Sequence, residues 1–134
     1  MNPHWAGGIV VLFVLTTASG AHAGTPESIL DARPCGPDSV TGPLRWLIPQ
    51  GAFGADFRPA CRGHDACYDT PFANRSQCDQ QFLNGMLQAC DQSTHPVLCR
   101  RKARLMHRMT SRHGASSFQS AQAVALRTVA ATGP

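Results

Sequence analysis

The chain has 134 residues, enough for one small domain, and its formal net charge of +4 is mild. Six cysteines in so short a chain favour an exported, disulfide-linked fold over a cytosolic one. The basic residues crowd into positions 100–112 without interleaved aromatic rings or a known nucleic-acid-binding motif, so we expect no nucleic-acid partner.

Residues 1–23 have the pattern of a secretory signal peptide. Residues 9–15 are a short apolar core, and Ala21-His22-Ala23 is an A-x-A cleavage site before Gly24. The apolar run is too short to cross a bilayer comfortably, and an uncleaved anchor is the alternative. We therefore expect a mature domain over 24–118 that keeps all six cysteines and is secreted, either to the extracellular space or to the periplasm.

Residues 35–59 are predicted to form a long, ordered, irregular loop. Glycine and proline interrupt any regular element there, yet several apolar side chains still need burial. We therefore expect this loop to pack across the helices that follow. Long ordered loops are usually functional. Its apolar residues are Leu44, Trp46, Leu47, Ile48, Phe53 and Phe57.

A helix is predicted over 59–68, since Pro59 suits a first helical position. At about 100° per residue, an arc of roughly 100° on this helix carries a cysteine, a titratable base, a carboxylate and a phenol on one side. These residues are Cys61, His64, Asp65 and Tyr68.

A second helix is predicted over 76–90. Its buried face follows the i, i+3, i+4, i+7 spacing and consists of Asp79, Phe82, Leu83, Met86 and Cys90. A carboxylate in such an apolar stripe costs several kcal/mol unless it finds a partner. If the two helices lie side by side, His64 and Tyr68 can supply that partner. Asp79 would then orient and charge the imidazole of His64, which would act as a general base.

The six cysteines allow 15 pairings, so spacing alone does not settle them. Cys67 closes the first helix and Cys78 opens the second, and a disulfide between them would link two antiparallel helices. The set that we favour is Cys35–Cys61, Cys67–Cys78 and Cys90–Cys99. The alternative for the spacing Cys61-x-x-His64-x-x-Cys67 is a zinc site, which would leave an odd set of cysteines elsewhere.

A third helix is predicted from residue 97 to 113, ended by Gly114 in the left-handed conformation. Phe118 is the last side chain expected to pack, and residues 119–134 are expected to be a disordered tail. The basic side chains of the third helix are either a solvated face or a surface attracted to anionic lipid. No stretch alternates well enough to predict a strand. The fold class is therefore all-α: a small disulfide-linked domain in which an antiparallel helix pair, preceded by the long loop, carries the site.

The run His64-Asp65-Ala66-Cys67-Tyr68, answered by Cys78-Asp79 on the next helix, resembles the secreted phospholipase A2 superfamily. Phe53-Gly54 and Phe57 ahead of Cys61 make it look closest to the compact bacterial and fungal members. The resemblance covers about residues 35–118. It implies a calcium-dependent hydrolase that cleaves the sn-2 ester of glycerophospholipids at a membrane or micelle surface. The products would be a lysophospholipid and a free fatty acid, and we expect a monomer.

The resemblance also implies roles for the matching residues. His64 falls on the general base, Asp79 on the aspartate that orients it, and Tyr68 on the tyrosine that hydrogen-bonds this aspartate. Asp65 falls on the side-chain ligand of Ca²⁺, an ion that prefers one carboxylate together with loop carbonyls and waters.

The carbonyl ligands of the calcium site are less well defined, because the glycine-rich calcium loop of the larger members is not reproduced. The carbonyls of Pro34, Gly36 and Asp38 are the expected ligands, and a carbonyl within 51–55 is the alternative. The larger members also have a cysteine where this chain has Ala60. Two further hypotheses follow from these differences: a non-catalytic module of the same fold that binds lipid or protein, and a small exported structural protein.

Overall fold

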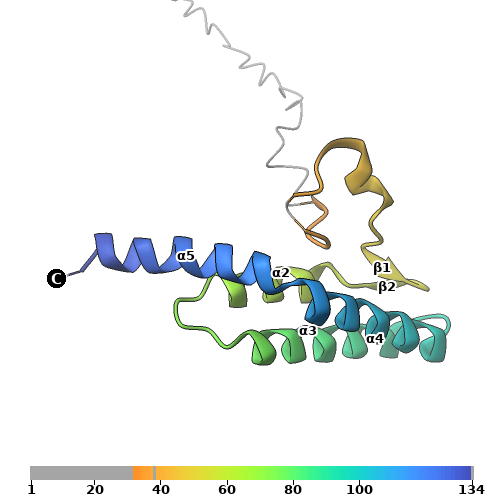
Figure 1. Ribbon diagram of the computed structural model, residues 1–134. Coiled ribbons are helices and arrows are strands. Elements are labelled where there is room, and N and C mark those ends of the chain that lie inside the picture. Colours follow the sequence, from red (N-terminus) through yellow and green to blue (C-terminus); the bar gives the residue numbers. More distant parts are fainter. Residues whose placement is uncertain (1–31, 38, 134) are drawn as a thin grey trace, which may run out of the picture.

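The computed structural model describes residues 32–37 and 39–133. The predicted signal peptide and Asp38 lie outside the described residues. The element order is η1 (Gly42–Leu47), β1 (Gly51–Ala52), β2 (Ala55–Asp56), α2 (Arg58–Tyr68), α3 (Arg75–Ala89), η2 (Cys90–Gln92), α4 (Pro96–His113) and α5 (Ala115–Ala131). The protein is a small all-α domain, as predicted (Figure 1).

The catalytic candidates lie on α2 and α3, which pack against each other along their length. α2 begins at Arg58 with a proline in its first turn, and the side chain of Asn74 caps α3 by accepting a hydrogen bond from the Gln77 amide at 3.1 Å. The disulfide Cys67–Cys78 joins the end of α2 to the start of α3. At the opposite end of the pair, a Cβ added to Gly85 would lie 3.0 Å from that of Ala60. The two helices are therefore antiparallel.

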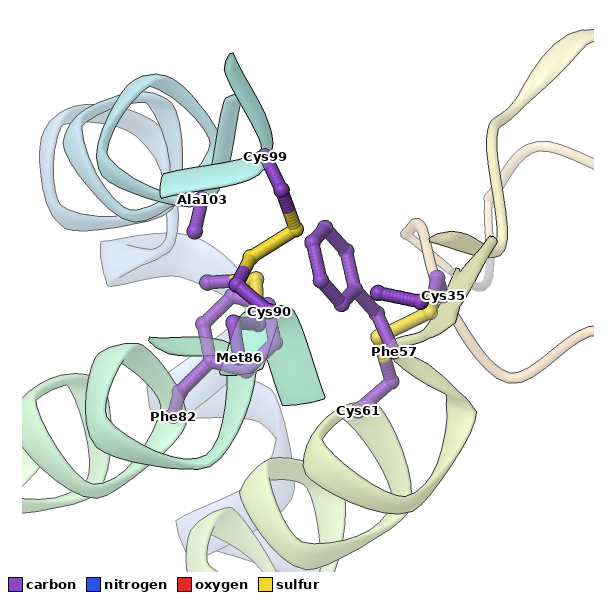
Figure 2. Packing of buried hydrophobic residues seen from close by; sticks show 9 residues of the cluster. Cys35, Phe57, Cys61, Phe82, Met86, Cys90, Cys99 and Ala103 are labelled. Atoms are coloured by element: carbon purple, nitrogen blue, oxygen red, sulfur yellow. A yellow bond between two sulfur atoms is a disulfide. The ribbon is translucent and has the colours of Figure 1, made fainter. Parts of the chain in front are cut away.

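All three favoured disulfides are present: Cys35–Cys61, Cys67–Cys78 and Cys90–Cys99. Figure 2 shows the ring of Phe57, which is fully buried, between the first and the third of these bridges. Met86 and Ala103 complete the core from α3 and α4. Because so small a domain can bury little apolar surface, the half-cystines supply part of its core as well as its cross-links. Three disulfides are consistent with an oxidising environment.

The expectation of no strand was wrong in one place. β1 and β2 form an antiparallel hairpin of two residues each, with Gly51 paired to Asp56 and Ala52 to Ala55. Phe53 and Gly54 form its turn, with φ of 52° and 83°. Two consecutive positive φ values are typical of the tightest hairpin turns. Strands of two residues are too short to show an alternating pattern in the sequence.

The third helix was predicted correctly, including its end at residue 113, but the conformation of Gly114 was not. Gly114 has φ −78° and ψ −2°, so it is not left-handed, and the chain continues directly into α5. A Cβ on Gly114 would lie 3.0 Å from the Tyr68 hydroxyl, so glycine is required there by close approach. The predicted disordered tail was also wrong, because residues 119–131 are helical.

The long loop is tied to α2 by Cys35–Cys61, but only part of it, including Ala55 and Phe57, packs against the helices as expected. The Arg45 side chain, 1% exposed, fills its centre. This guanidinium donates to the carbonyls of Arg33, Pro34, Pro37 and Val40 at 2.8–3.4 Å. Three of its apolar side chains face outward, and their exposed fractions are 63% for Leu44, 64% for Trp46 and 77% for Leu47. Among the described residues, no helix has the length and hydropathy needed to cross a bilayer.

Candidate active site

His64 of α2 and Asp79 of α3 form a buried pair. Nε2 of His64 lies 2.9 Å from Oδ1 of Asp79, and the two residues are 8% and 4% exposed. The Cys67–Cys78 disulfide lies beside this pair, since each half-cystine is within three residues of one member. The covalent link between the helices therefore fixes the register that brings the imidazole to the carboxylate.

Tyr68 completes the surroundings of this carboxylate. Its hydroxyl donates a hydrogen bond to the same oxygen of Asp79 at 2.7 Å. Burial, and then the hydrogen bond and charge of Asp79, raise the pKa of Tyr68 well above its usual range. The phenol therefore stays protonated and remains a donor. Among the described residues, no buried side-chain nitrogen or oxygen lacks a hydrogen-bond partner.

The geometry assigns the tautomer of His64. An ionised carboxylate can only accept, so Nε2 must carry the proton that faces Asp79. In the neutral imidazole this leaves the lone pair on Nδ1, which lies 3.9 Å from Oδ1 of Asp65. A ring nitrogen that has its lone pair free and its opposite nitrogen held by a carboxylate is arranged to accept a proton.

The pKa of His64 is raised above its ordinary value of 6.5. Burial on its own would lower it, but hydrogen bonding and charge from Asp65 and Asp79 outweigh the cost of burial. The ring also contacts two aromatic neighbours, with centroids 4.1 Å from that of Tyr68 and 4.8 Å from that of Phe82. These contacts restrict the rotation of the imidazole.

The helix α5 supports this group from outside. Phe118 packs edge-on against Tyr68 with centroids 5.0 Å apart. The Gln122 amide nitrogen donates to the carbonyls of Tyr68 at 2.6 Å and Thr70 at 2.8 Å, and its amide oxygen accepts from the Phe72 amide at 3.0 Å. One side chain thus binds three backbone groups where α2 ends. The prediction missed Gln122, and a lone polar residue with backbone partners leaves no signal in the sequence.

The calcium candidates are only partly assembled. Asp65 has a half-exposed carboxylate, and among the described residues it has neither arginine nor lysine as an ion-pair partner. It is a hard oxygen donor open to solvent, which fits Ca²⁺. The described residues contain no group of three His, Cys, Asp or Glu side chains that could hold a metal, so carbonyls and waters would have to complete any shell.

The expected carbonyl ligands fit less well than Asp65. Pro34 is buried and its carbonyl already accepts from Nη2 of Arg45 at 3.4 Å, whereas Gly36 is exposed. In the alternative segment, the Phe53 carbonyl accepts from both the amide and the hydroxyl of Thr94, at 2.9 and 3.0 Å. Of the expected ligands that the structure describes, the Pro34 carbonyl is therefore already engaged by a guanidinium.

The zinc alternative is wrong, because Cys61 and Cys67 are both in disulfides and no cysteine is free. No family model, curated protein or solved structure matches the chain. The class of this protein is therefore defined by the geometry of its fold and its site. It is a small disulfide-linked helical protein with a His–Asp pair buried between two antiparallel helices.

Proposed function

We propose that the protein is a calcium-dependent hydrolase of the phospholipase A2 type that cleaves the sn-2 ester of glycerophospholipids. The observation that carries the proposal is the buried pair of His64 and Asp79, 2.9 Å apart, with the Nδ1 lone pair of His64 left to accept a proton. The resemblance of the run from His64 to Tyr68 to the secreted phospholipases supports the choice of substrate.

In this proposal Nδ1 of His64 takes a proton from a water molecule while the water oxygen attacks the ester carbonyl carbon. Asp79 stabilises the imidazolium that forms, and Tyr68 holds Asp79 in place. The imidazolium then returns the proton to the departing glycerol oxygen as the carbon–oxygen bond breaks. The products are a lysophospholipid and a free fatty acid.

Asp65 would hold the calcium ion, together with carbonyls among Pro34, Gly36 and Asp38. When bound, Ca²⁺ supplies charge that polarises the ester carbonyl and stabilises the oxyanion. Of these carbonyls, that of Pro34 is the weakest candidate, since it is already bonded to Arg45. Asp65 lies beside Nδ1 of His64, which would bring the metal and the general base to the same ester.

In this proposal the protein is secreted and monomeric, and it acts at a phospholipid membrane or micelle surface. The exposed side chains of Leu44, Trp46 and Leu47 suit a rim that touches lipid better than the lining of an acyl channel. Tryptophan in particular favours the membrane–water interface.

The test is fatty-acid release from phospholipid vesicles with Ca²⁺, with a chelator, and with the variant His64→Gln. His113→Gln is the matched control, because it makes the same chemical change on an exposed residue at the end of α4. We expect release that requires both Ca²⁺ and His64 and that survives His113→Gln. Fatty-acid release that continues both in the chelator and in His64→Gln would refute the proposal.

A second candidate is the non-catalytic module that binds lipid or protein. The observation that favours it is the Arg45 guanidinium, which takes up carbonyls of the loop where calcium ligands were expected. It predicts a folded protein that binds vesicles or a partner protein but releases no fatty acid at any Ca²⁺ concentration.

A further inference from the structure

The outer face of α4 is unusual because large apolar side chains and arginines share it. The helix buries Cys99 and Ala103 against the core. At 100° per residue, the opposite side carries two neighbouring stripes. The apolar stripe, which we call the leucine stripe, consists of Leu98, Leu105 and Met109, and these residues are 46%, 52% and 50% exposed. The arginine row beside it consists of Arg101, Arg104, Arg108 and Arg112, all exposed.

The arginine row is not neutralised by the protein. Arg100, on the flank of the helix, pairs with Asp91 at 2.6 Å. In the part of the chain that the structure describes, no ion pair joins a carboxylate to any member of the row. Four adjacent positive charges on one helix face therefore point to an anionic partner.

We propose that this face of α4 binds the surface of an anionic phospholipid bilayer. Guanidinium groups form paired hydrogen bonds with phosphate oxygens, and the leucine stripe lies next to them, as in helices that rest in the headgroup region. Nucleic acid offers phosphates but no apolar layer for Leu105 and Met109, and the face has no aromatic ring on which bases could stack. The proposal does not depend on the proposed hydrolysis, since the bilayer is bound whether or not an ester is cleaved.

Charge and apolar contact should contribute in separable ways. Each arginine near an anionic surface strengthens binding about fivefold at moderate salt. This part weakens as salt rises, because counterions screen exposed charges. The contribution of Leu105 and Met109 comes from apolar burial, which salt does not screen.

The experiment is sedimentation of the protein with vesicles, in a chelator and in the His64→Gln background, so that neither Ca²⁺ nor hydrolysis contributes. The vesicles are pure phosphatidylcholine, or phosphatidylcholine mixed with phosphatidylglycerol. The test variant is Arg101→Gln/Arg108→Gln. The control is Arg62→Gln/Arg127→Gln, which removes the same charge from exposed positions on α2 and α5.

We expect binding to the mixed vesicles only, about 25-fold weaker for the test variant and nearly unchanged for the control. Leu105→Gln/Met109→Gln should weaken binding that remains at high salt, and circular dichroism checks that each variant is folded. Equal losses in the test and control variants would mean that net charge alone attracts the protein, and would overturn the proposal. So would binding to neither vesicle, or displacement from the vesicles by an equal charge of duplex DNA.

Discussion

At the residue scale, the state of His64 is determined by the carboxylate behind it. Asp79 accepts hydrogen bonds on one oxygen from both the imidazole and the Tyr68 hydroxyl, at 2.9 and 2.7 Å. The variant Asp79→Asn removes the charge of this side chain but keeps its shape. It therefore tests the orientation and charge of His64 without changing the packing around residue 79. The imidazolium formed during turnover would lose its counter-charge, and the tautomer would no longer be fixed.

For the proposed reaction we therefore expect Asp79→Asn to lower kcat about 10²- to 10⁴-fold. The matched control is Asp91→Asn, which alters an exposed carboxylate whose partner is Arg100. Initial rates of fatty-acid release measure the effect, and circular dichroism checks the fold. A folded Asp79→Asn protein with the kcat of the parent would show that the pair is structural only.

The raised pKa of His64 predicts how stability depends on pH. A folded pKa above the unfolded value of 6.5 means that the charged imidazole stabilises the fold fully below that pH, and that this contribution is lost as pH rises through the raised pKa. His64→Gln should therefore destabilise the protein more at about pH 5 than at about pH 9. Urea unfolding at both pH values measures the difference, and a larger cost at the alkaline pH would contradict the assigned direction.

The same shift predicts the acid limb of the proposed activity. A general base must be neutral, so kcat/KM should rise with pH through the pKa of His64, which Asp79 raises and which a Ca²⁺ ion on Asp65 would lower. In Asp79→Asn one of the carboxylates that raise this pKa is gone. The midpoint of its residual activity should therefore move to lower pH, and a midpoint that stays in place would argue against Asp79 as one of the causes of the raised pKa.

At the element scale, α5 holds the end of α2 through one side chain. The last carbonyls of a helix have no partner inside it, and Gln122 donates to that of Tyr68 and to the Thr70 carbonyl just beyond the helix. It also accepts from the Phe72 amide. We expect Gln122→Ala to cost about 1–2 kcal/mol of unfolding free energy, because these bonds are partly open to solvent.

Gln119→Ala is the matched control for that variant, since Gln119 is exposed on the same helix. Urea unfolding gives the stability. Hydrogen exchange gives a local readout, because the Phe72 amide should exchange faster in Gln122→Ala and not in Gln119→Ala. Equal exchange at Phe72 in both variants would mean that the contact does not hold the loop in solution.

This contact also explains why the helix pair was predictable and α5 was not. The helices carrying His64 and Asp79 were predicted from the spacing of apolar residues, from Pro59 and from the need of a buried acid for a partner. The apolar spacing and Pro59 are signals within a single helix. The buried acid restricts which side chains can lie opposite it. Beyond Phe118, which was expected to pack, the docking of α5 depends on backbone groups of residues 68–72, which look the same in every sequence.

The burial of Arg45 in the long loop was not predictable for a related reason. The Arg45 guanidinium donates to backbone carbonyls of residues 33–40, and a backbone carbonyl leaves no mark in the sequence. A guanidinium needs only oxygen acceptors arranged around it, and backbone carbonyls provide them once the loop is folded. The prediction that the loop buries its apolar side chains followed from their hydropathy, and it was correct for Phe57 but wrong for Trp46.

At the scale of the whole molecule, three disulfides connect parts that contribute differently to the site. The closed loops span 26 residues for Cys35–Cys61, 11 for Cys67–Cys78 and 9 for Cys90–Cys99. Loop-closure entropy grows with loop length, so these bridges should contribute about 3.5, 2.8 and 2.6 kcal/mol in that order. These are large fractions of the ~5–15 kcal/mol typical of a domain.

The loss of the proposed activity on removing each disulfide should not follow the order of the stability losses. Replacing Cys67 and Cys78 by serine removes the link that fixes the register of His64 and Asp79, whereas the long loop keeps its own Arg45 network when Cys35 and Cys61 are replaced. We therefore expect the Cys67→Ser/Cys78→Ser protein to lose more of the proposed activity, although it is the more stable of the two variants. Urea unfolding and fatty-acid release, both measured at a temperature where each variant is folded, compare the orders. If activity falls in proportion to lost stability, the bridge between the two helices contributes cross-linking alone, and the packing of α2 against α3 sets the register without it.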